Sequence, residues 1–276
     1  MGMFSWIKRK ICKDPEPEKT DVATVVDGLV EKGFNRERAI ATARYIIEKE
    51  TPKRENREKV AEKAQTIHIE GEKDEDKTID TDWLNRFFGI VEDVSDEDMQ
   101  DIWARILAGE NKHPSSYSLR TLDVLRNMSK EEAKLFVDCT KYLCLKDKLL
   151  IEDDYGLSLD EQLLLTDIGL ISNEDLQNTI TVNPKGTMNI VVNKNHLLVF
   201  TNPTNNKKEI KIKDRQLTRV GKELLNLIDE TDYLKAVDVI VKKLKGAGFD
   251  PIKLHKINYW TSDVNFNYNT HPEKEY

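Results

Sequence analysis

The sequence predicts a mainly helical α+β protein with a helical bundle near its centre. Over residues 82–142, apolar residues recur at the spacing of amphipathic helices, and capping residues precede the apolar runs. Over residues 187–218, apolar and polar residues alternate around turn sequences, and Val, Ile, Phe and Thr are frequent, which is typical of antiparallel strands. Before residue 80 the pattern is again helical, but the chain is more highly charged.

Composition narrows the class of protein. The chain has 276 residues, of which 38% are hydrophobic and 34% are charged, a composition that suits one or two soluble domains. Its apolar runs are far shorter than the roughly 20 residues that cross a bilayer, so no transmembrane segment is expected. Three cysteines without a paired framework favour a reducing, cytoplasmic location. The formal net charge of −7 argues against a surface devoted entirely to phosphate backbones, although it is compatible with a local basic face.

Residues 1–50 are predicted to form a leader and a helical hairpin. Residues 3–13 combine Phe and Trp with Lys and Arg, so they either contact a membrane surface or a partner, or pack on their own domain. In the following segment, Gly33 suits the left-handed end of one helix and Asn35 suits the start of the next. The residues expected on the inner face of the second helix are Ala39, Ala43, Ile46 and Ile47.

Residues 51–79 are predicted to form a charged helix and linker. Charges of both signs alternate there with few large apolar residues, which is typical of a solvated spacer. The run GEKDED at residues 71–76 indicates a flexible joint, so a domain boundary is expected at this point.

Residues 80–150 are predicted to form the central helical bundle. The helix starts predicted from capping residues lie at Asp82, Ser95 and Ser129. Glu132 stands at the capping-box spacing after Ser129, which strengthens the prediction for the last helix of the bundle. Gly109 is expected to end the second helix, before the polar turn HPSSYS.

The residues of this bundle resemble a known family. The run from Trp83 through DMQDIWARILAGE to HPSSYSLRTLDVLRNMSKEEAKLF resembles the uncharacterised bacterial domain-of-unknown-function family 2806. More distantly, ARILAGE, His-Pro and LRNMSKEEAKLF are similar to the alpha-type abortive infection proteins of phage defence. The resemblance is strong over residues 80–145 and weaker over residues 160–260, where LTDIGLI and LTRVGKELLNLI look like recurring features. It implies a bacterial protein with a defence role, and it supplies no catalytic residues.

Polar residues around the turn of the bundle form the first candidate site: Arg105, Glu110, His113, Ser116 and Arg120. A Glu and a His three residues apart, with Arg and Ser nearby, suit acid–base chemistry or anion binding. The alternative is structural, because Arg105 and Glu110 can satisfy free groups at helix ends and Ser116 or Ser118 can cap the following helix. His113 has no second His or Cys at metal spacing, so no metal site is expected.

Residues 151–276 are predicted to form an α+β region that resembles a winged helix. A helix over DEQLLLTDIGLI precedes two or three antiparallel strands and a helix capped by Thr218. A further helix, from Asp232 to Lys245, and the strand IKLHKINYW follow. His255 is expected to be half-exposed on that strand, and the tail after Thr261 is expected to be loosely held.

The second candidate site is a basic hairpin in this region. Its residues are Lys194, Lys207, Lys208, Lys211, Lys213 and Arg215. A local excess of positive charge of this kind suits contacts with nucleic-acid phosphates. The alternative is that the lysines protect sheet edges from pairing, since aromatic residues for base stacking are scarce nearby.

The motifs of common enzyme classes are missing from the sequence. GxGxxG, GxxxxGK(S/T), HExxH, GxSxG and CxxC do not occur, so no cofactor is expected and a non-catalytic role is favoured. A divergent nuclease that needs only scattered carboxylates and a lysine stays an alternative. The favoured function is a defence or regulatory component that acts through protein–protein contacts of the central bundle, with a protein partner or as a homo-oligomer. The alternative is a nucleic-acid-binding protein that uses the basic hairpin.

Overall fold

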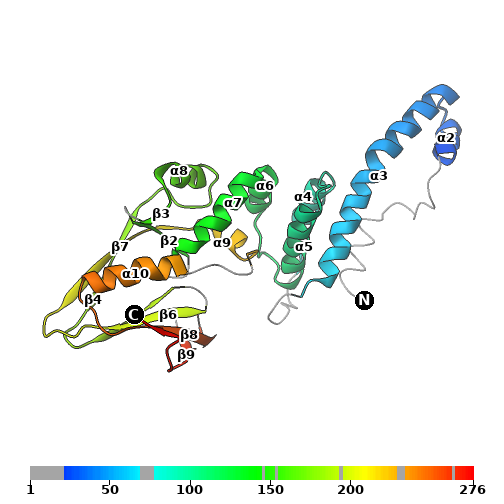
Figure 1. Ribbon diagram of the computed structural model, residues 1–276. Helices are drawn as coiled ribbons and strands as arrows, with labels where there is room; N and C mark the ends of the chain where they lie inside the picture. Colours follow the sequence, from blue (N-terminus) through cyan, green and yellow to red (C-terminus); the bar gives the residue numbers. More distant parts are fainter. Residues whose placement is uncertain are drawn as a thin grey trace. The chain divides into compact units, whose positions relative to one another are not determined.

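A computed structural model describes residues 22–68, 78–144, 147–152, 155–192, 195–228, 234–262 and 265–276. The chain divides into two compact units, residues 1–122 and 123–276. Helices and two antiparallel sheets make up these units, which confirms the predicted α+β class (Figure 1). The expected leader contact of residues 3–13, the joint at residues 71–76 and Lys194 lie outside the described residues. No helix within the described ranges is long and apolar enough to span a membrane.

The first unit begins with the predicted helical hairpin. Helix α2 (Val22–Glu31) and helix α3 (Arg36–Thr66) are joined at Gly33, whose φ of 92° is a conformation that glycine adopts without steric cost. Asn35 caps α3, since its side-chain oxygen accepts a hydrogen bond of 2.8 Å from the Arg38 amide. The local sequence therefore specifies both the end of α2 and the start of α3.

The core of this hairpin is small. Its fully buried residues are Val26, Ala39 and Ala43. Ile46, which was expected on the inner face, is 36% exposed, so that expectation is wrong for this residue. Alanines let the two helices approach closely, and little room remains between the helices for a larger side chain.

Helix α3 runs on through the segment expected to be a solvated spacer. Residues Val60, Ala61 and Ala64 are buried, and α3 contacts α4 (Thr81–Val91) and α5 (Glu97–Lys112). The expectation of a solvated spacer is therefore wrong for residues 51–66, although the segment is helical as predicted. Small residues on one face are enough to bury a helix, but they give only a weak apolar pattern in a sequence.

The helix starts of the bundle differ slightly from the predicted ones. Asp80 rather than Asp82 caps α4, and Asp96 rather than Ser95 caps α5, each through its Oδ1. In both cases the capping residue is the one with extended backbone directly before the first helical turn. Helix α5 also continues past Gly109, because this glycine has no positive φ and so does not end the helix.

Aromatic rings fill the core of the first unit. The Trp83 and Phe87 rings stack at 5.1 Å between centroids, and the Trp103 ring meets Phe87 edge-on at 5.7 Å. All three side chains are buried, as their positions on the predicted apolar stripes require.

Among the described residues, five helical segments lie between α5 and α10. Helix α7 begins at the predicted capping box of Ser129 and Glu132. Helix α8 begins at a second capping box, of Ser158 and Glu161, which was not predicted from the sequence. The bounds are α6 (Leu119–Asn127), α7 (Lys130–Cys139), the 3-10 helix η1 (Thr140–Tyr142), α8 (Leu159–Asp167) and α9 (Arg219–Leu225).

The second unit holds two five-stranded antiparallel sheets. The first sheet has the order β1-β2-β7-β4, with β3 paired to β2, and its strands are β1 (Leu143–Cys144), β2 (Lys148–Glu152), β3 (Tyr155–Gly156), β4 (Leu176–Val182) and β7 (Lys208–Gln216). The second has the order β10-β8-β6-β5, with β9 paired to β8, and its strands are β5 (Thr187–Val191), β6 (His196–Thr201), β8 (Ile252–Trp260), β9 (Phe266–Tyr268) and β10 (Lys274–Glu275).

One long hairpin connects these two sheets. Strands β4 and β7 pair in the first sheet, and their continuations β5 and β6 pair in the second. Asn202 lies where the hairpin bends and is fully buried; its side-chain amide donates hydrogen bonds to three carbonyls, and its Oδ1 accepts two from Thr204. Residues 187–218, predicted to form two or three antiparallel strands, form three: β5, β6 and β7. Strand β4 was not predicted, and the winged-helix arrangement is not confirmed.

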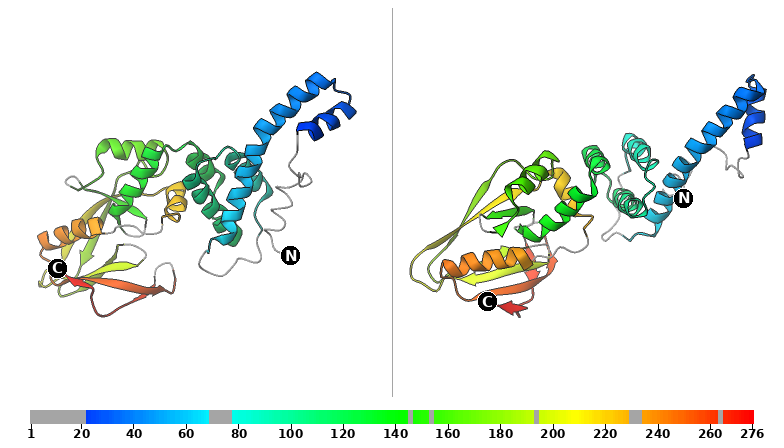
Figure 2. Two further views of the ribbon diagram at one scale, coloured as in Figure 1. Left: turned by 45° about the vertical axis from the view of Figure 1, so that its right-hand side comes forward. Right: turned by 45° about the horizontal axis from the view of Figure 1, so that its top comes forward.

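Helix α10 (Leu234–Gly246) contributes to a core shared with both sheets (Figures 1 and 2). Val237, Ile240 and Leu244 are fully buried there, beside Ile212 of β7 and Leu198 of β6. The helix was predicted to start at Asp232, which lies outside the described residues. Its apolar face is broad, as expected for a helix that is covered by two layers.

The end of the chain pairs with β8. Strands β9 and β10 both pair with β8, along the edge that faces away from β6, and Tyr276 packs against the shared core. The expectation of a loosely held tail is therefore wrong for residues 265–276. His255 is only 5% exposed, and its Nδ1 lies 2.8 Å from the carbonyl oxygen of Asn269, so the expectation of a half-exposed histidine is also wrong. Pairing with β8 holds the tail in place, and the tail covers His255; a local sequence pattern does not reveal such pairing.

Candidate functional site

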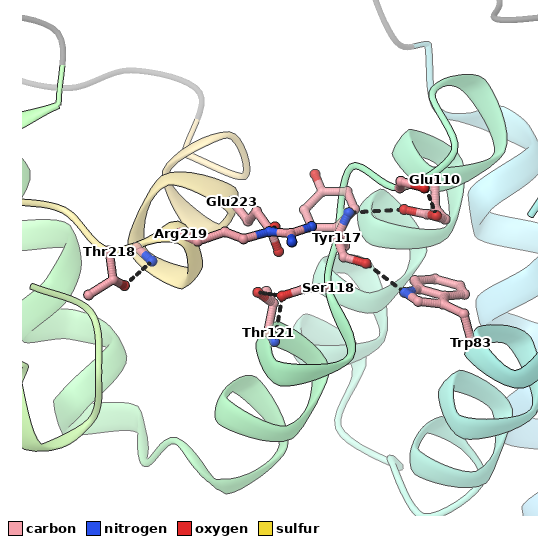
Figure 3. A network of polar contacts seen from close by, with 10 residues as sticks. Trp83, Glu110, Tyr117, Ser118, Thr121, Thr218, Arg219 and Glu223 are labelled. Carbon is pink, nitrogen blue, oxygen red and sulfur yellow. Dashed lines mark hydrogen bonds and ion pairs between the residues drawn. The ribbon is translucent and has the colours of Figure 1, made fainter. Parts of the chain in front are cut away.

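The first candidate cluster surrounds the turn after α5, within the first unit. Glu110 is 2% exposed, and its two carboxylate oxygens accept hydrogen bonds from the backbone amides of Ser115 at 2.6 Å and Tyr117 at 3.0 Å (Figure 3). Ser115 has a φ of 75°, which is uncommon for a residue other than glycine. A buried carboxylate that accepts two amide hydrogen bonds holds this turn in one conformation.

Tyr117 also joins the turn to α4 and α5. Its carbonyl oxygen accepts a hydrogen bond of 2.7 Å from the indole Nε1 of Trp83 (Figure 3). Its ring lies so close to Gly109 that a Cβ at position 109 would be 2.9 Å from a ring carbon. Gly109 is therefore required for close packing rather than for ending the helix. The sequence alone offers no signal for this contact, because residues 109 and 117 meet only after the chain has turned.

The other members of this cluster lie in or next to the turn. Arg105 is partly buried on α5, and Arg120 is exposed on α6. The His113 amide donates to the Gly109 carbonyl, and the Ser116 hydroxyl donates to the His113 carbonyl. The structure thus brings Glu110, His113 and Ser116 into one turn.

These contacts favour the structural interpretation of the cluster. Glu110 satisfies backbone amides, as that interpretation expects, and its carboxylate is covered by the turn that it binds. The cap of α6 is Ser118 rather than Ser116, because the Thr121 amide donates to the Ser118 hydroxyl at 3.3 Å (Figure 3). The acid–base role of the cluster stays a prediction.

The second candidate cluster is divided between the two faces of β7. Lys211 is exposed and Lys213 is partly exposed, and the alternation of a strand places both on one face. Lys207 precedes the strand, is exposed and forms an ion pair of 3.9 Å with Glu209. We call the exposed face of β4 and β7 that carries Lys211 and Lys213 the outer face of the first sheet.

Lys208 points to the opposite face of β7 and contacts the end of α10. Its Nζ donates hydrogen bonds of 2.6 Å to the carbonyls of Ala247 and Gly248. It also lies 5.4 Å from the centroid of the Phe249 ring. An ammonium group at a helix C-terminus satisfies free carbonyls and interacts favourably with the helix dipole.

Arg215 is buried beside the start of β4. Its Nε donates to Asp175 at 2.6 Å, and its side chain is 9% exposed. The structure therefore places Lys211 and Lys213 on one face of β7, with Lys207 just before the strand, and pairs Lys208 and Arg215 with other groups of the same chain.

Asp214 is a residue of this region that was not singled out from the sequence. It faces the core side of β7, fully buried, with the Nζ of Lys148 at 3.8 Å and the side-chain amide of Asn178 donating to it. Burial raises the pKa of the Asp214 carboxyl above its usual value. Within the described part of the chain, its Oδ1 accepts no hydrogen bond. The sequence did contain a signal for Asp214, because an acidic residue stands there at an inward position of an alternating strand.

Among the described residues, no group of three or more His, Cys, Asp or Glu side chains is placed to hold a metal ion. The predicted absence of cofactors is a separate matter and stays a prediction.

The fold and these polar networks define a two-unit α+β protein in which buried polar residues stabilise turns and strand ends. The family model described as a protein of unknown function, DUF2806, matches residues 39–152 and 142–238, and the chain belongs to this family. The matched residues include Glu110, His113 and all the basic residues of the hairpin. No curated protein and no solved structure matches the chain. The more distant similarity to abortive infection proteins stays a prediction.

Proposed function

We propose that this protein is a non-catalytic defence or regulatory component of a bacterium and that it acts through protein–protein contacts. The observation that carries the proposal is a group of exposed apolar side chains on the hairpin of α2 and α3. Its members are Val30, Phe34, Tyr45 and Ile46. Tyr45 is 64% exposed and Phe34 is 43% exposed, so both present apolar surface that a partner would cover.

The hairpin has little core of its own to explain these residues. Only Val26, Ala39 and Ala43 are fully buried between α2 and α3. A pair of amphipathic helices is normally covered by a further layer. A partner that presents an apolar helix face supplies that layer and buries Phe34 and Tyr45. The central bundle, through which contacts were first expected, buries its large aromatic residues Trp83, Phe87 and Trp103. Contacts through its surface stay a prediction.

The defence role draws its support from the sequence similarity of the bundle to abortive infection proteins. A phage challenge tests it: bacteria that express the full chain are compared with bacteria that carry an empty vector, over a panel of phages. The expected result is a lower efficiency of plating for at least one phage. If no phage of the panel is affected, the defence role is contradicted and a regulatory role remains.

A variant pair tests the contact surface in the same assay. Phe34→Asp and Tyr45→Asp place charge on the exposed hairpin residues, and protection should be lost. Tyr259→Asp is the matched control, since Tyr259 is equally large and 58% exposed but lies on β8. Far-ultraviolet circular dichroism checks that each variant folds. Protection that survives both hairpin substitutions would show that this surface is not the one that acts.

A second function is favoured by the outer face of the first sheet. Lys211 and Lys213 share this face and Lys207 precedes the strand, and this supports nucleic-acid binding by the hairpin. Fluorescence anisotropy with duplex and single-stranded DNA and RNA, at low and moderate salt, tests it. Binding should weaken steeply with salt and with Lys207→Gln plus Lys211→Gln.

The matched control for this test is Lys235→Gln plus Lys245→Gln, which removes the same charge from exposed positions on α10. Binding that both double variants weaken equally would indicate a general charge effect rather than a site on β7. An absence of binding at low salt would remove the nucleic-acid function for these ligands.

A further inference from the structure

We propose that strand β4 is a docking edge at which a second copy of this chain pairs, so that the first sheets of two molecules join into one antiparallel sheet. Strand β4 ends the order β1-β2-β7-β4, and in the described chain only its β7 side carries a partner strand. A free strand edge presents a row of N–H and C=O groups that another strand can bind. This inference goes beyond the proposed function, since it concerns self-association and requires no other protein.

Strand β4 is the longest of the described edge strands and carries no charge. It has seven residues, LQNTITV, with no charge and no proline. Among the other described edge strands, β1, β3 and β10 have two residues each and β9 has three. Short or charged edge strands resist pairing with other chains. Of the described edge strands with more than three residues, β5 (TMNIV) is also uncharged, and it offers a shorter edge.

The side chains of β4 suit pairing with a copy of themselves. Antiparallel pairing about the middle residue, Thr179, uses all seven residues and places Thr179 opposite the Thr179 of the second copy. Leu176 then lies opposite Val182, which adds cover to a Leu176 side chain that is only partly buried in one chain. Thr–Thr and aliphatic pairs are favourable cross-strand neighbours. A two-fold interface of this kind uses the same strand from both molecules.

Charge at the ends of β4 favours the same arrangement. Glu174 precedes the strand and Lys185 follows it, and both are exposed. In an antiparallel pair, the Glu174 of one copy comes to the same end as the Lys185 of the other. Opposite charges therefore meet at both ends, and no like charges meet along the uncharged strand. A parallel pairing would bring Glu174 beside Glu174 and lose this match.

Light scattering after size-exclusion chromatography of the full chain tests the proposal. The expected mass is twice the 31.9 kDa of one chain. Thr179→Lys places two like charges directly opposite each other, so it should shift the mass to that of one chain. Asn189→Lys is the matched control, because Asn189 is exposed at the middle of β5, and it should leave the dimer intact. Circular dichroism should be unchanged in both variants.

Cysteine cross-linking locates the contact. In a chain with Cys12→Ser, mild oxidation should link Thr179→Cys into a covalent dimer, because the two positions face each other across the two-fold axis. Asn189→Cys should stay uncrosslinked. A wild-type chain that runs as a monomer overturns the proposal. So does a dimer that persists in Thr179→Lys or that links through Asn189→Cys. Phe34→Asp should leave the dimer unchanged, which separates this test from that of the hairpin surface.

Discussion

Gly221 lies in the first turn of α9, directly against the turn that follows α8. The Thr218 hydroxyl caps α9 by accepting a hydrogen bond of 3.1 Å from the Gly221 amide, and it donates to the Gly169 carbonyl at 2.6 Å. The Thr218 amide donates to the Leu170 carbonyl at 3.0 Å. A Cβ at position 221 would lie only 2.2 Å from that same Leu170 oxygen. Gly221→Ala therefore forces apart the two segments that these hydrogen bonds hold together.

The size of the effect follows from two opposing contributions. In an open helical position, glycine to alanine stabilises the folded state by roughly 0.5–1 kcal/mol. Here the methyl group meets a backbone oxygen, and insertion of atoms into a well-packed site costs about 1–3 kcal/mol or more. The steric cost prevails, since a backbone carbonyl cannot rotate away as a side chain can. We expect Gly221→Ala to lower the free energy of unfolding by about 2 kcal/mol, which corresponds to roughly 4–8 °C in the melting temperature of a unit of this size.

Thermal unfolding followed by far-ultraviolet circular dichroism measures this loss. Gly246→Ala is the control, because Gly246 is a helical glycine of the same unit and a Cβ at this position would meet no heavy atom within 4 Å. Hydrogen exchange of peptides that cover residues 165–171 and 217–225 should speed up in Gly221→Ala and not in the control. If Gly221→Ala melts no lower than Gly246→Ala, the close approach of α9 to Leu170 is refuted.

Three further predictions concern buried polar groups. Glu110→Ala should lower the free energy of unfolding by about 2–4 kcal/mol and Glu110→Gln by less, because the amides of the turn lose a charged acceptor. Urea unfolding measures both variants. An unchanged urea midpoint for Glu110→Ala would contradict the structural role of Glu110. Burial raises the pKa of the Cys139 thiol to about 12, so iodoacetamide should label Cys139 only after urea unfolds the chain. Mass spectrometry of the labelled peptide measures this. Equally fast labelling of the native chain would count against the burial of Cys139. Burial raises the pKa of the Asp214 carboxyl above 3.8, so the folded state binds the carboxyl proton more tightly than the unfolded state does. The free energy of unfolding that this proton contributes is fully present below pH 3.8 and is lost as the pH rises through the pKa of the folded state. Asp214→Asn should therefore reduce the fall in urea midpoint as the pH is raised, and an identical pH profile would exclude this contribution.

The local interactions of this protein were predictable from neighbouring residues. Asn35, Ser129 and Thr218 cap the helices that follow them, as expected, and Gly33 and Gly169 have the positive φ of helix ends. Each of these features depends on residues within one turn of each other, so a short window of sequence contains all the partners. Near misses were also local: Asp80 and Asp82 both have the chemistry of a cap, and the exact start of α4 selects between them.

The candidate sites depended on distant partners, and the sequence left their alternatives open. The sequence places six basic residues in the hairpin, but only strand pairing and the position of α10 direct Lys208 to the carbonyls of Ala247 and Gly248. In the same way, Arg215 meets Asp175 only because β4 and β7 are neighbours in the first sheet.

By itself the sequence therefore determined the α+β class, most helix starts and the family, because these depend on local pattern and on residue identity. Tertiary structure alone decided which polar residues are buried and which are exposed. It made Glu110 the acceptor for a turn, Gly109 and Gly221 points of close approach, and β4 a free edge. The physical reason is that burial and pairing are set by segments far apart in the chain, and a residue's own neighbours in sequence carry no record of them.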